Sequence, residues 1–250
     1  MDFDLIEKIK NLADKYETAD FLKADPSQFM HRYSEVRDKE AVAFLAANLA
    51  FGNRKQILSH VEQILSVVEL SGKTPSEWIL SGEYNAFCEN RLTQTFYRMY
   101  TYNDLLLFFD ALRAILKENS TIGDYFKAKY THGARLHTII ADSFPVDCKM
   151  ISHSKDGAAK KLNMLLRWLV RDNSPVDLGL WTWYDKKNLL IPLDTHVMQV
   201  AQSWNLITGK SANLKTAVEL SEKMKLVFPS DPTKADFALF GLGVNKGDLP

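Results

Sequence analysis

Lys160 lies at a position in a predicted helix that favours nucleophilic chemistry. Leucines at helical spacing predict a helix over residues 158–171, which places Lys160 in its first turn. The positive end of the helix dipole disfavours a cation there, and the neighbouring Lys161 adds a second positive charge. Both effects favour the neutral amine, which is the form that attacks an electrophilic carbon. A solvated face that carries Lys160 and Arg167 would give the same charge pattern, so both interpretations stay open.

Asp194 precedes a second predicted helix, in the segment PLDTHV at residues 192–197. An aspartate there is typical of a helix N-cap, because its carboxylate accepts a hydrogen bond from a free backbone amide. The helix dipole also stabilises negative charge at that point, which suits a carboxylate that must stabilise a cation. Helix capping and catalysis therefore both stay open for Asp194. His196 has no second metal-ligand candidate at suitable spacing, and we expect no metal and no other cofactor.

The elements that must position these residues are helices. Apolar residues recur at helical spacing along nearly the whole chain, and period-two alternation is scarce. Only residues 189–191 resemble a strand, whereas Asp231 followed by Pro232 predicts the start of another helix. The helical pattern lapses between residues 144 and 156. We therefore expect one all-α domain over residues 1–250, a compact multi-helix fold in two lobes.

Composition excludes several classes of protein. The chain has 250 residues, 46% of them hydrophobic and 25% charged, and its formal net charge is zero. No global charge imbalance therefore points to nucleic acid or membrane, and nucleic-acid binding would need a local patch. The two cysteines, Cys88 and Cys148, stand far apart and cannot by themselves ligate zinc or an iron–sulfur cluster. Without a membrane-length apolar run or a signal peptide, we expect a cytoplasmic protein that does not enter a membrane.

Motifs along most of the chain resemble a bacterial protein family without an assigned function. They are AFGNR at 50–54, FYR at 96–98, KKLNMLLRWLVR at 160–171, PLDTHV at 192–197 and DFALFGLG at 236–243. Within residues 150–243, KKLNMLLRW and IPLDTHV also resemble the helix–hairpin–helix superfamily of base-excision DNA glycosylases. The spacing from Lys160 to Asp194, 34 positions, is similar to that of its archaeal 8-oxoguanine DNA glycosylase branch. This second resemblance implies a helix–hairpin–helix glycosylase-like fold.

The glycosylase resemblance also implies roles for individual residues. Lys160 matches the lysine that attacks C1′ of the damaged nucleotide, and Asp194 matches the carboxylate that stabilises the sugar cation. Residues 50–55 occupy, by order in the chain, the place of the loop that fills the gap left by a flipped base. The resemblance implies an aromatic ring that stacks on that base, either Phe237 or Phe240. The residues it implies for nucleic-acid binding are Asn53, Arg54, Lys55, Arg98, Lys155 and Arg167.

One departure from the superfamily concerns the glycine-rich hairpin before the lysine helix. The corresponding turn here reads SHSKDGAAK, in which Gly157 is the single glycine. The function implied by the resemblance is a bifunctional DNA glycosylase and AP lyase, acting on a damaged purine such as 8-oxoguanine in double-stranded DNA. The missing hairpin favours an alternative, a nucleic-acid-binding module on the same scaffold without catalysis. A third alternative, a protein-binding helical adaptor, predicts no salt-dependent binding to nucleic acid.

Overall fold

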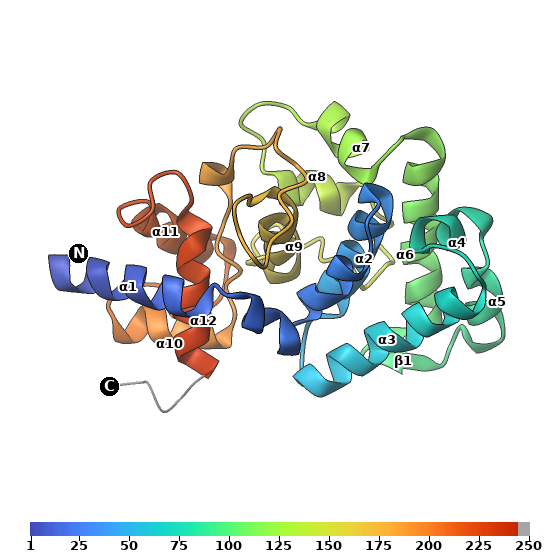
Figure 1. The fold of residues 1–250 in the computed structure, drawn as a ribbon, viewed down its shortest axis with the longest axis horizontal. Coiled ribbons are helices and arrows are strands. Elements are labelled where there is room, and N and C mark those ends of the chain that lie inside the picture. Colours follow the sequence, from blue (N-terminus) through green and yellow to red (C-terminus); the bar gives the residue numbers. More distant parts are fainter. Residues whose placement is uncertain (245–250) are drawn as a thin grey trace. The chain divides into compact units, whose positions relative to one another are not determined.

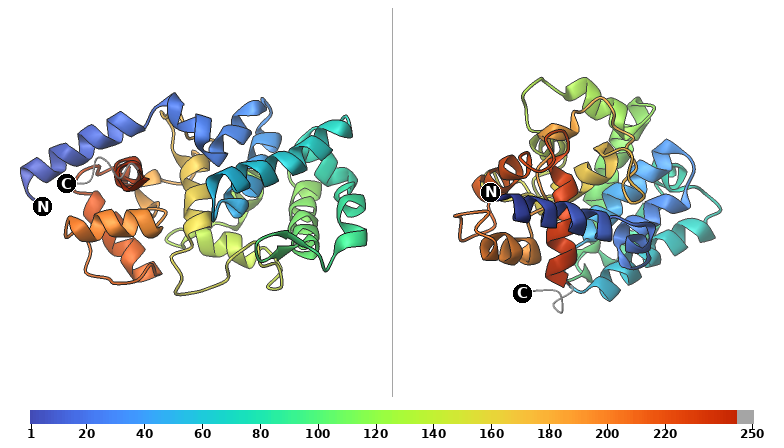
Figure 2. Two further views of the ribbon diagram at one scale, coloured as in Figure 1. Left: turned by 90° about the horizontal axis from the view of Figure 1, so that it is seen from below. Right: turned by 60° about the vertical axis from the view of Figure 1, so that its left-hand side comes forward.

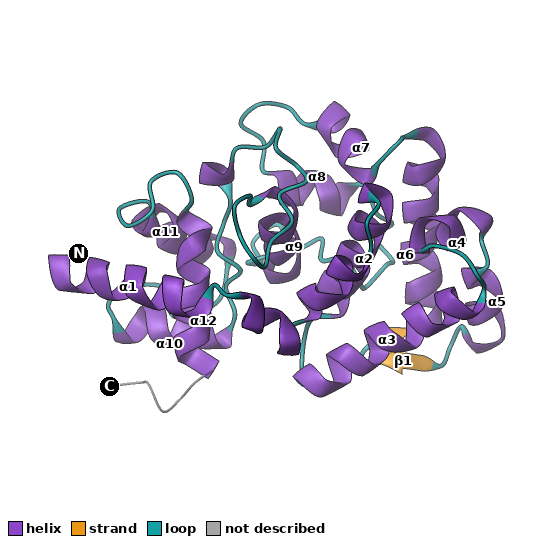
Figure 3. Cartoon of the chain, in the orientation of Figure 1, coloured by secondary structure: helices purple, strands orange, loops and turns teal. Residues whose placement is uncertain are grey.

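Helices account for most of residues 1–244, which are the residues that the computed structural model describes (Figure 3). The strands of this part of the chain form one short antiparallel hairpin, β1 (Thr95–Tyr97) and β2 (Tyr100–Thr101). The expectation of a mostly helical protein is confirmed. The expected strand at residues 189–191 is wrong, because the amide of Ile191 donates to the side chain of Ser221 (2.9 Å) and not to a neighbouring strand. Among residues 1–244, none of the helices has the length and apolar character needed to cross a bilayer.

The chain divides into two compact units. The terminal unit consists of residues 1–23 and the chain from residue 154 onward, and the central unit consists of residues 24–153. The second boundary falls inside residues 144–156, where the helical sequence pattern lapses. Nothing in the sequence pattern predicts that the first helix belongs with the C-terminal half of the chain.

The terminal unit is built around α12, the helix that carries the DFALFGLG motif (Figure 1). Helix α1 crosses α12 closely, as Figure 2 shows for the blue and red helices. A Cβ atom at Gly241 would lie 2.3 Å from the ring of Tyr16, so glycine permits this approach. Gly243 has the same role toward α10, because a Cβ atom there would lie 2.8 Å from the side chain of His196. The helices of this unit are α1 (Phe3–Tyr16), η1 (Ala19–Ala24), which runs into the central unit, α9 (Lys160–Val170), η4 (Lys186–Asn188), α10 (Thr195–Ser203), α11 (Leu214–Met224), η5 (Pro232–Lys234) and α12 (Ala235–Val244).

The central unit has a core rich in aromatic rings. Phe44 stacks against Phe126 and Phe144 with ring centroids 5.9 and 6.2 Å apart, and Phe108 stacks on Phe144 at 5.6 Å. These rings come from α2, α6 and α7 and from the segment after α8. The helices of this unit are η2 (Pro26–Arg32), α2 (Val36–Leu49), α3 (Arg54–Leu70), α4 (Pro75–Ser81), α5 (Tyr84–Cys88), η3 (Glu89–Arg91), α6 (Tyr102–Glu118), α7 (Ile122–Lys129) and α8 (Leu136–Asp142).

Two buried carboxylates on α2 tie the helices of the central unit together. Glu40 is 1% exposed and accepts hydrogen bonds from the amides of Ile122 (2.7 Å) and Gly123 (3.0 Å), at the start of α7. Asp38 accepts from the amide of Ser76 (2.8 Å), at the start of α4. Amides in the first turn of a helix have no partner within that helix, and they carry the positive end of its dipole. Both carboxylates therefore have a structural role as caps for other helices.

Candidate functional site

Lys160 is the first residue of α9, two residues later than the sequence pattern predicts for the start of this helix. Ala159, immediately before it, adopts a left-handed conformation (φ 46°), and no side chain caps the helix. Asn163 fixes the turn, because its side-chain amide donates to the carbonyl oxygen of Ala158 (2.9 Å) and its backbone amide to that of Ala159 (2.9 Å). Lys160 itself is half-buried. The lysine therefore stands at the open end of a helix whose path into the first turn is fixed.

Asp194 caps α10. Its carboxylate accepts a hydrogen bond from the amide of Val197 (2.9 Å), which confirms the capping interpretation. The side chain is half-buried, and one capping bond leaves the carboxylate further acceptor capacity. Capping and a chemical role are therefore compatible at this residue.

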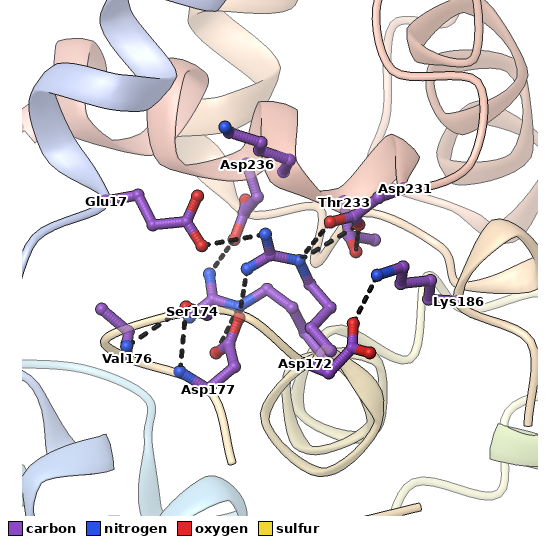
Figure 4. Close-up of polar contacts among 12 residues, drawn as sticks. Glu17, Asp172, Ser174, Val176, Asp177, Lys186, Asp231, Thr233 and Asp236 are labelled. Carbon is purple, nitrogen blue, oxygen red and sulfur yellow. Dashed lines mark hydrogen bonds and ion pairs between the residues drawn. The ribbon is translucent and has the colours of Figure 1, made fainter. Parts of the chain in front are cut away.

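The centre of the terminal unit is a buried network of two arginines and four carboxylates. Arg167 and Arg171 lie one turn apart on α9, with side chains only 4% and 2% exposed. Arg167 contacts Asp177 (3.3 Å) and forms a short ion pair with Asp236. Figure 4 shows Glu17, Asp177, Asp231 and Asp236 gathered around the two guanidinium groups. The interpretation of Arg167 as part of a solvated face is wrong, since its side chain is buried and paired with Asp177 and Asp236.

Arg171 holds three of these carboxylates. Its Nε atom donates to both oxygens of Asp231 (2.9 and 3.1 Å), while its terminal nitrogens pair with Glu17 (2.9 Å) and with Asp177. Burial alone lowers the pKa of Arg171, but Asp177, Asp231 and Glu17 outweigh it and raise the pKa above its usual value. The side chain therefore stays charged inside the protein. Through it, α1, α9 and the segment before α12 are joined by ion pairs.

Asp236, at the second position of α12, connects this network to Lys160 and Asp194. Burial raises the pKa of Asp236 to about 6, against the effect of Arg167; the charge of Asp194 raises it further and that of Lys160 lowers it. Lys160 and Asp194 therefore act on the same buried carboxyl group, although 34 positions separate them in the sequence. Oδ1 of Asp236 is buried, and within residues 1–244 no hydrogen-bond partner reaches it.

Sequence reasoning missed the acidic half of this site. Asp231 was expected to cap the helix at Pro232, but it makes no side-chain cap bond there, because both of its oxygens accept from Arg171. Asp177 lies in a loop between α9 and α10 and shows no periodic signal. Two features could have indicated the network: arginines four positions apart on a leucine-rich helix, and an aspartate at the start of the apolar segment DFALFGLG.

Two residues expected to meet nucleic acid lie in the interior. Arg167 was predicted to bind phosphate, but it is 3% exposed and paired with Asp177 and Asp236, so it presents no charge to the surface. Phe237 was predicted to stack on a flipped base, yet it is 0% exposed, with the Arg167 guanidinium 4.4 Å above its ring and Phe21 at its edge. Stacking on a base would require this cover to be displaced.

Two other predicted residues of the terminal unit are accessible. Phe240 is half-buried, with the rings of Phe21 and His196 each 6.2 Å away. Lys155 is exposed on the loop before α9. That loop is held to the start of α11 by a hydrogen bond from the amide of Leu214 to Asp156 (2.8 Å) and by the bridge between Gly157 and Asn213. Nucleic-acid binding by Lys155 and base stacking by Phe240 therefore stay predictions.

The remaining cationic candidates belong to the central unit. Asn53 caps α3 by accepting from the amide of Gln56 (3.3 Å), and Arg54 and Lys55 form the first turn of that helix. Arg98 lies at the tip of the β1–β2 hairpin. All four side chains are exposed. The central unit therefore brings Asn53 and Arg98 near each other, because Gly52 lies against the Arg98 side chain.

The chemistry available around Lys160 follows from its charges. One half-buried amine and two guanidinium groups face five carboxylates, those of Glu17, Asp177, Asp194, Asp231 and Asp236. Carboxylates outnumber the cations among these groups, which suits a reaction in which positive charge develops. Within the described part of the chain, no group of three His, Cys, Asp or Glu side chains is arranged to hold a metal ion.

The comparison with protein families agrees with the motif resemblance along the chain. A family model described as "Protein of unknown function (DUF2400)" matches residues 25–245. This match includes nearly all of the central unit and residues 154–245 of the terminal unit, but not residues 1–23, and the chain belongs to that family. No curated protein and no solved structure matches the chain significantly. Membership confirms the expectation of a family without an assigned function, and it carries no information about an activity.

Proposed function

We propose that the chain is a DNA glycosylase with AP lyase activity on a damaged purine, with Lys160 as the nucleophile. The observation that carries the proposal is that Lys160 and Asp194 each stand at the start of a helix and that the charges of both act on the pKa of the buried Asp236. A lysine at an uncapped helix start beside an excess of carboxylates is suited to attack a carbon that becomes cationic. The resemblance of KKLNMLLRW and IPLDTHV to glycosylase segments supplies the substrate class, an 8-oxoguanine nucleotide in duplex DNA.

The proposed reaction begins when the damaged nucleotide is turned out of the duplex, at an unstacking cost of a few kcal/mol. The Nζ atom of Lys160, as free amine, forms a bond to C1′ while the C1′–N9 bond breaks. The base leaves with the bonding electron pair and takes up a proton. Opening of the sugar ring then gives a Schiff base between C1′ and Nζ. Loss of a C2′ proton expels the 3′ phosphate by β-elimination, and water finally hydrolyses the Schiff base and returns the amine.

Asp194 has the electrostatic role in this mechanism. Its carboxylate stabilises the positive charge that develops on the sugar as the base leaves. The capping bond to Val197 holds the carboxylate in place before substrate arrives, so the protein need not reorganise during the reaction. Asp236 and its ion pair to Arg167 keep the adjoining interior negative and fix the start of α12 against α9.

The test is borohydride trapping on a duplex that contains one 8-oxoguanine. Borohydride reduces the Schiff base to a stable amine, so the proposal predicts a covalent protein–DNA adduct with the native chain and none with Lys160→Gln. Lys161→Gln is the matched control, since it removes the neighbouring lysine of the same helix turn and should still trap. Asp194→Asn should slow adduct formation by roughly 10²–10³-fold, the usual effect of removing one group that stabilises a developing charge. Full trapping by Lys160→Gln would show that another nucleophile acts.

A second function, nucleic-acid binding without base excision, is favoured by the segment before α9. Helix α8 ends at Asp142 and α9 begins at Lys160, and residues 143–159 between them contain no helix. This connection is much longer than a tight hairpin, and Ala159 takes the left-handed position where glycine would be expected. Under this alternative the chain retards the migration of duplex DNA, yet it forms no adduct and releases no base from any oxidised or alkylated duplex. A protein-binding adaptor would show neither effect at any salt concentration.

A further inference from the structure

The central unit joins two sequence motifs, AFGNR and FYR, into one surface feature. The hydroxyl of Tyr97 on β1 donates a hydrogen bond to the carbonyl oxygen of Phe51, in the loop between α2 and α3. The ring of Phe51 lies against those of Tyr97 and Tyr100, with centroids 5.2 and 5.0 Å away. The loop before α3 and the β1–β2 hairpin therefore form one body, held by buried aromatic packing.

The backbone at the tip of this body is strained and closely fitted. The hairpin turns through Arg98 and Met99, and Arg98 adopts a left-handed conformation (φ 52°) that is uncommon for a residue with a side chain. Its guanidinium lies 5.6 Å from the Phe51 ring centroid. Gly52 is itself left-handed (φ 93°), and a Cβ atom there would lie 2.8 Å from Nη1 of Arg98. Strain that the surrounding packing maintains in this way is typical of a functional position.

Met99 projects from this tip as an exposed apolar side chain, 62% accessible. The exposed Asn53, Arg54, Lys55 and Arg98 belong to the same two motifs or adjoin them, and we call these four residues with Met99 the hairpin–loop face. No acidic residue occurs in residues 41–61 or 91–103, which supply it. Leu70 and Val146 are more exposed, at 88% and 80%, but they stand next to Glu69 and Asp147. The hairpin thus presents an exposed apolar side chain among cations, in two segments that carry no acidic residue.

We propose that the hairpin–loop face binds duplex DNA, with Met99 inserted as an apolar wedge between base pairs while the cations hold the flanking phosphates. The choice of DNA rests on the proposed function, whereas the wedge rests on the face itself. Proteins that kink duplexes insert apolar side chains, methionine among them, at a base step, and they offset the unstacking cost by binding phosphates. Methionine is unbranched and polarisable, and it fits the irregular gap at an opened base step. The Met99 side chain is already exposed before DNA binds.

The test uses the full chain and a fluorescent duplex that carries a stable tetrahydrofuran abasic analogue next to 2-aminopurine. This probe cannot be excised, and 2-aminopurine fluorescence increases when its base is unstacked. Binding of the native chain should increase the fluorescence. Met99→Ala should abolish the increase in fluorescence. It should also weaken binding roughly tenfold, because the methionine side chain would no longer be buried against the base pairs. Met99→Leu should restore both, since it returns an apolar side chain of similar size.

The other variants separate the wedge from the cations. Arg54→Ala with Lys55→Ala should weaken binding and lower the slope of log Kd against log salt by about one for each phosphate that is no longer bound. Leu70→Ala, at an exposed apolar residue of the same unit outside the face, should change neither binding nor fluorescence. Near-ultraviolet circular dichroism establishes that each variant is folded.

These experiments test the insertion of Met99 separately from base excision. If Met99→Ala bound the probe and increased its fluorescence like the native chain, the wedge would be wrong, even if Lys160 formed a borohydride adduct. If the native chain bound single-stranded or duplex RNA at least as tightly as this duplex, the choice of DNA would be wrong. If the Met99 variants behaved as expected but no lesion gave an adduct, base excision would fail and the hairpin–loop face would stand.

Discussion

The two units treat buried carboxylates in different ways. In the central unit, Glu40 and Asp38 each accept hydrogen bonds from backbone amides at the start of another helix. In the terminal unit, the carboxylates of Glu17, Asp177 and Asp236 are held by arginine side chains and not by helix amides. One oxygen of Asp236 has no hydrogen-bond partner within residues 1–244. The backbone fixes the amides that hold Glu40 and Asp38, whereas the carboxylates of the terminal unit share two arginine side chains.

This difference separates scaffolding from chemistry. A carboxylate that accepts hydrogen bonds from fixed amides has its negative charge stabilised by the backbone alone. Carboxylates that outnumber their cations compete for them, and burial then favours a proton on the group with the weakest support. Burial raises the pKa of two of these groups, Asp177 and Asp236, and that of Asp236 to about 6. We therefore expect the protonation of buried carboxylates to depend on pH in the terminal unit.

The largest effect should come from Arg171→Met. The substitution keeps an apolar stem of similar length but leaves Asp177, Asp231 and Glu17 without their shared cation. Removal of one partner from a buried ion pair costs about 3–5 kcal/mol, because a charge is left buried and uncompensated. Urea unfolding followed by tryptophan fluorescence measures this cost. Four of the five tryptophans, at positions 168, 181, 183 and 204, belong to the terminal unit and report on it.

Arg37→Met in the central unit is the control for a lost arginine. Arg37 donates to the carbonyl oxygen of Leu116 (2.9 Å). A loss of stability at Arg171 no greater than that at Arg37 would mean that the terminal network is not held by its charges.

The next effect is a pH dependence that Asp236→Asn should remove. The pKa of Asp236 is raised to about 6 in the folded chain, so between about pH 4 and pH 6 the unfolded chain releases this proton first. The stabilisation that protonated Asp236 gives the folded chain is fully present below pH 4 and is lost as the pH rises through 6. The free energy of unfolding falls by up to about 3 kcal/mol over this range. Asparagine cannot ionise, and the free energy of unfolding of Asp236→Asn should therefore gain on that of the native chain over this range.

The measurement is urea unfolding of both proteins at intervals between pH 4 and pH 7. The groups whose charge acts on Asp236 are Arg167, Asp194 and Lys160, and all three are unchanged in the variant. A constant difference between the two proteins across this range would contradict the raised pKa.

The third effect tests the amide caps of the central unit. Glu40→Gln keeps one oxygen acceptor but turns an amide group toward one of the two helix amides, Ile122 or Gly123. Hydrogen bonds to a charged group contribute about 1.5–3 kcal/mol, and the loss of one should cost about 2 kcal/mol. This cost should not vary between pH 6 and pH 8. Hydrogen exchange of the α7 amides locates it, and unchanged protection there would show that Glu40 is not the cap that matters.

Sequence patterns predict the helices well because leucine and aromatic periodicity reflects which face of a helix is buried. The caps were predictable where they were local, as for Asp194, whose partner Val197 lies three positions away. The buried network was not predictable, because Arg171 meets Asp231 across 60 positions and Glu17 across far more. The helical wheel placed Arg167 and Arg171 opposite the leucines and so predicted solvent, but a helix in a core can be covered on both faces.

The site was half predictable for the same reason. Lys160 and Asp194 were found because each begins a helix, which leaves a local signal in the sequence. Asp236 also stands near a helix start, but its partners come from other elements, and an aspartate in an apolar segment looks like a simple N-terminal charge. The hairpin at Tyr97 and Tyr100 was missed because two short strands give too few alternating positions to be recognised.

The smallest effect should come from the surface pair of Arg32 and Glu62. Two guanidinium nitrogens of Arg32 meet the two carboxylate oxygens of Glu62 at 2.9 and 2.7 Å, as close as the contacts of the buried pairs, but the side chains are 37% and 44% exposed. Glu62→Gln leaves the Arg32 guanidinium free to stay on the ring of Phe29, 4.6 Å away, so the charge of Glu62 is what is lost. Water screens exposed charges, and such pairs contribute about 0–1 kcal/mol, less at high salt. Urea unfolding at low and high salt should therefore show a small loss that vanishes with salt. A loss as large as that of Arg171→Met would mean that geometry, and not burial, sets the strength of ion pairs in this chain.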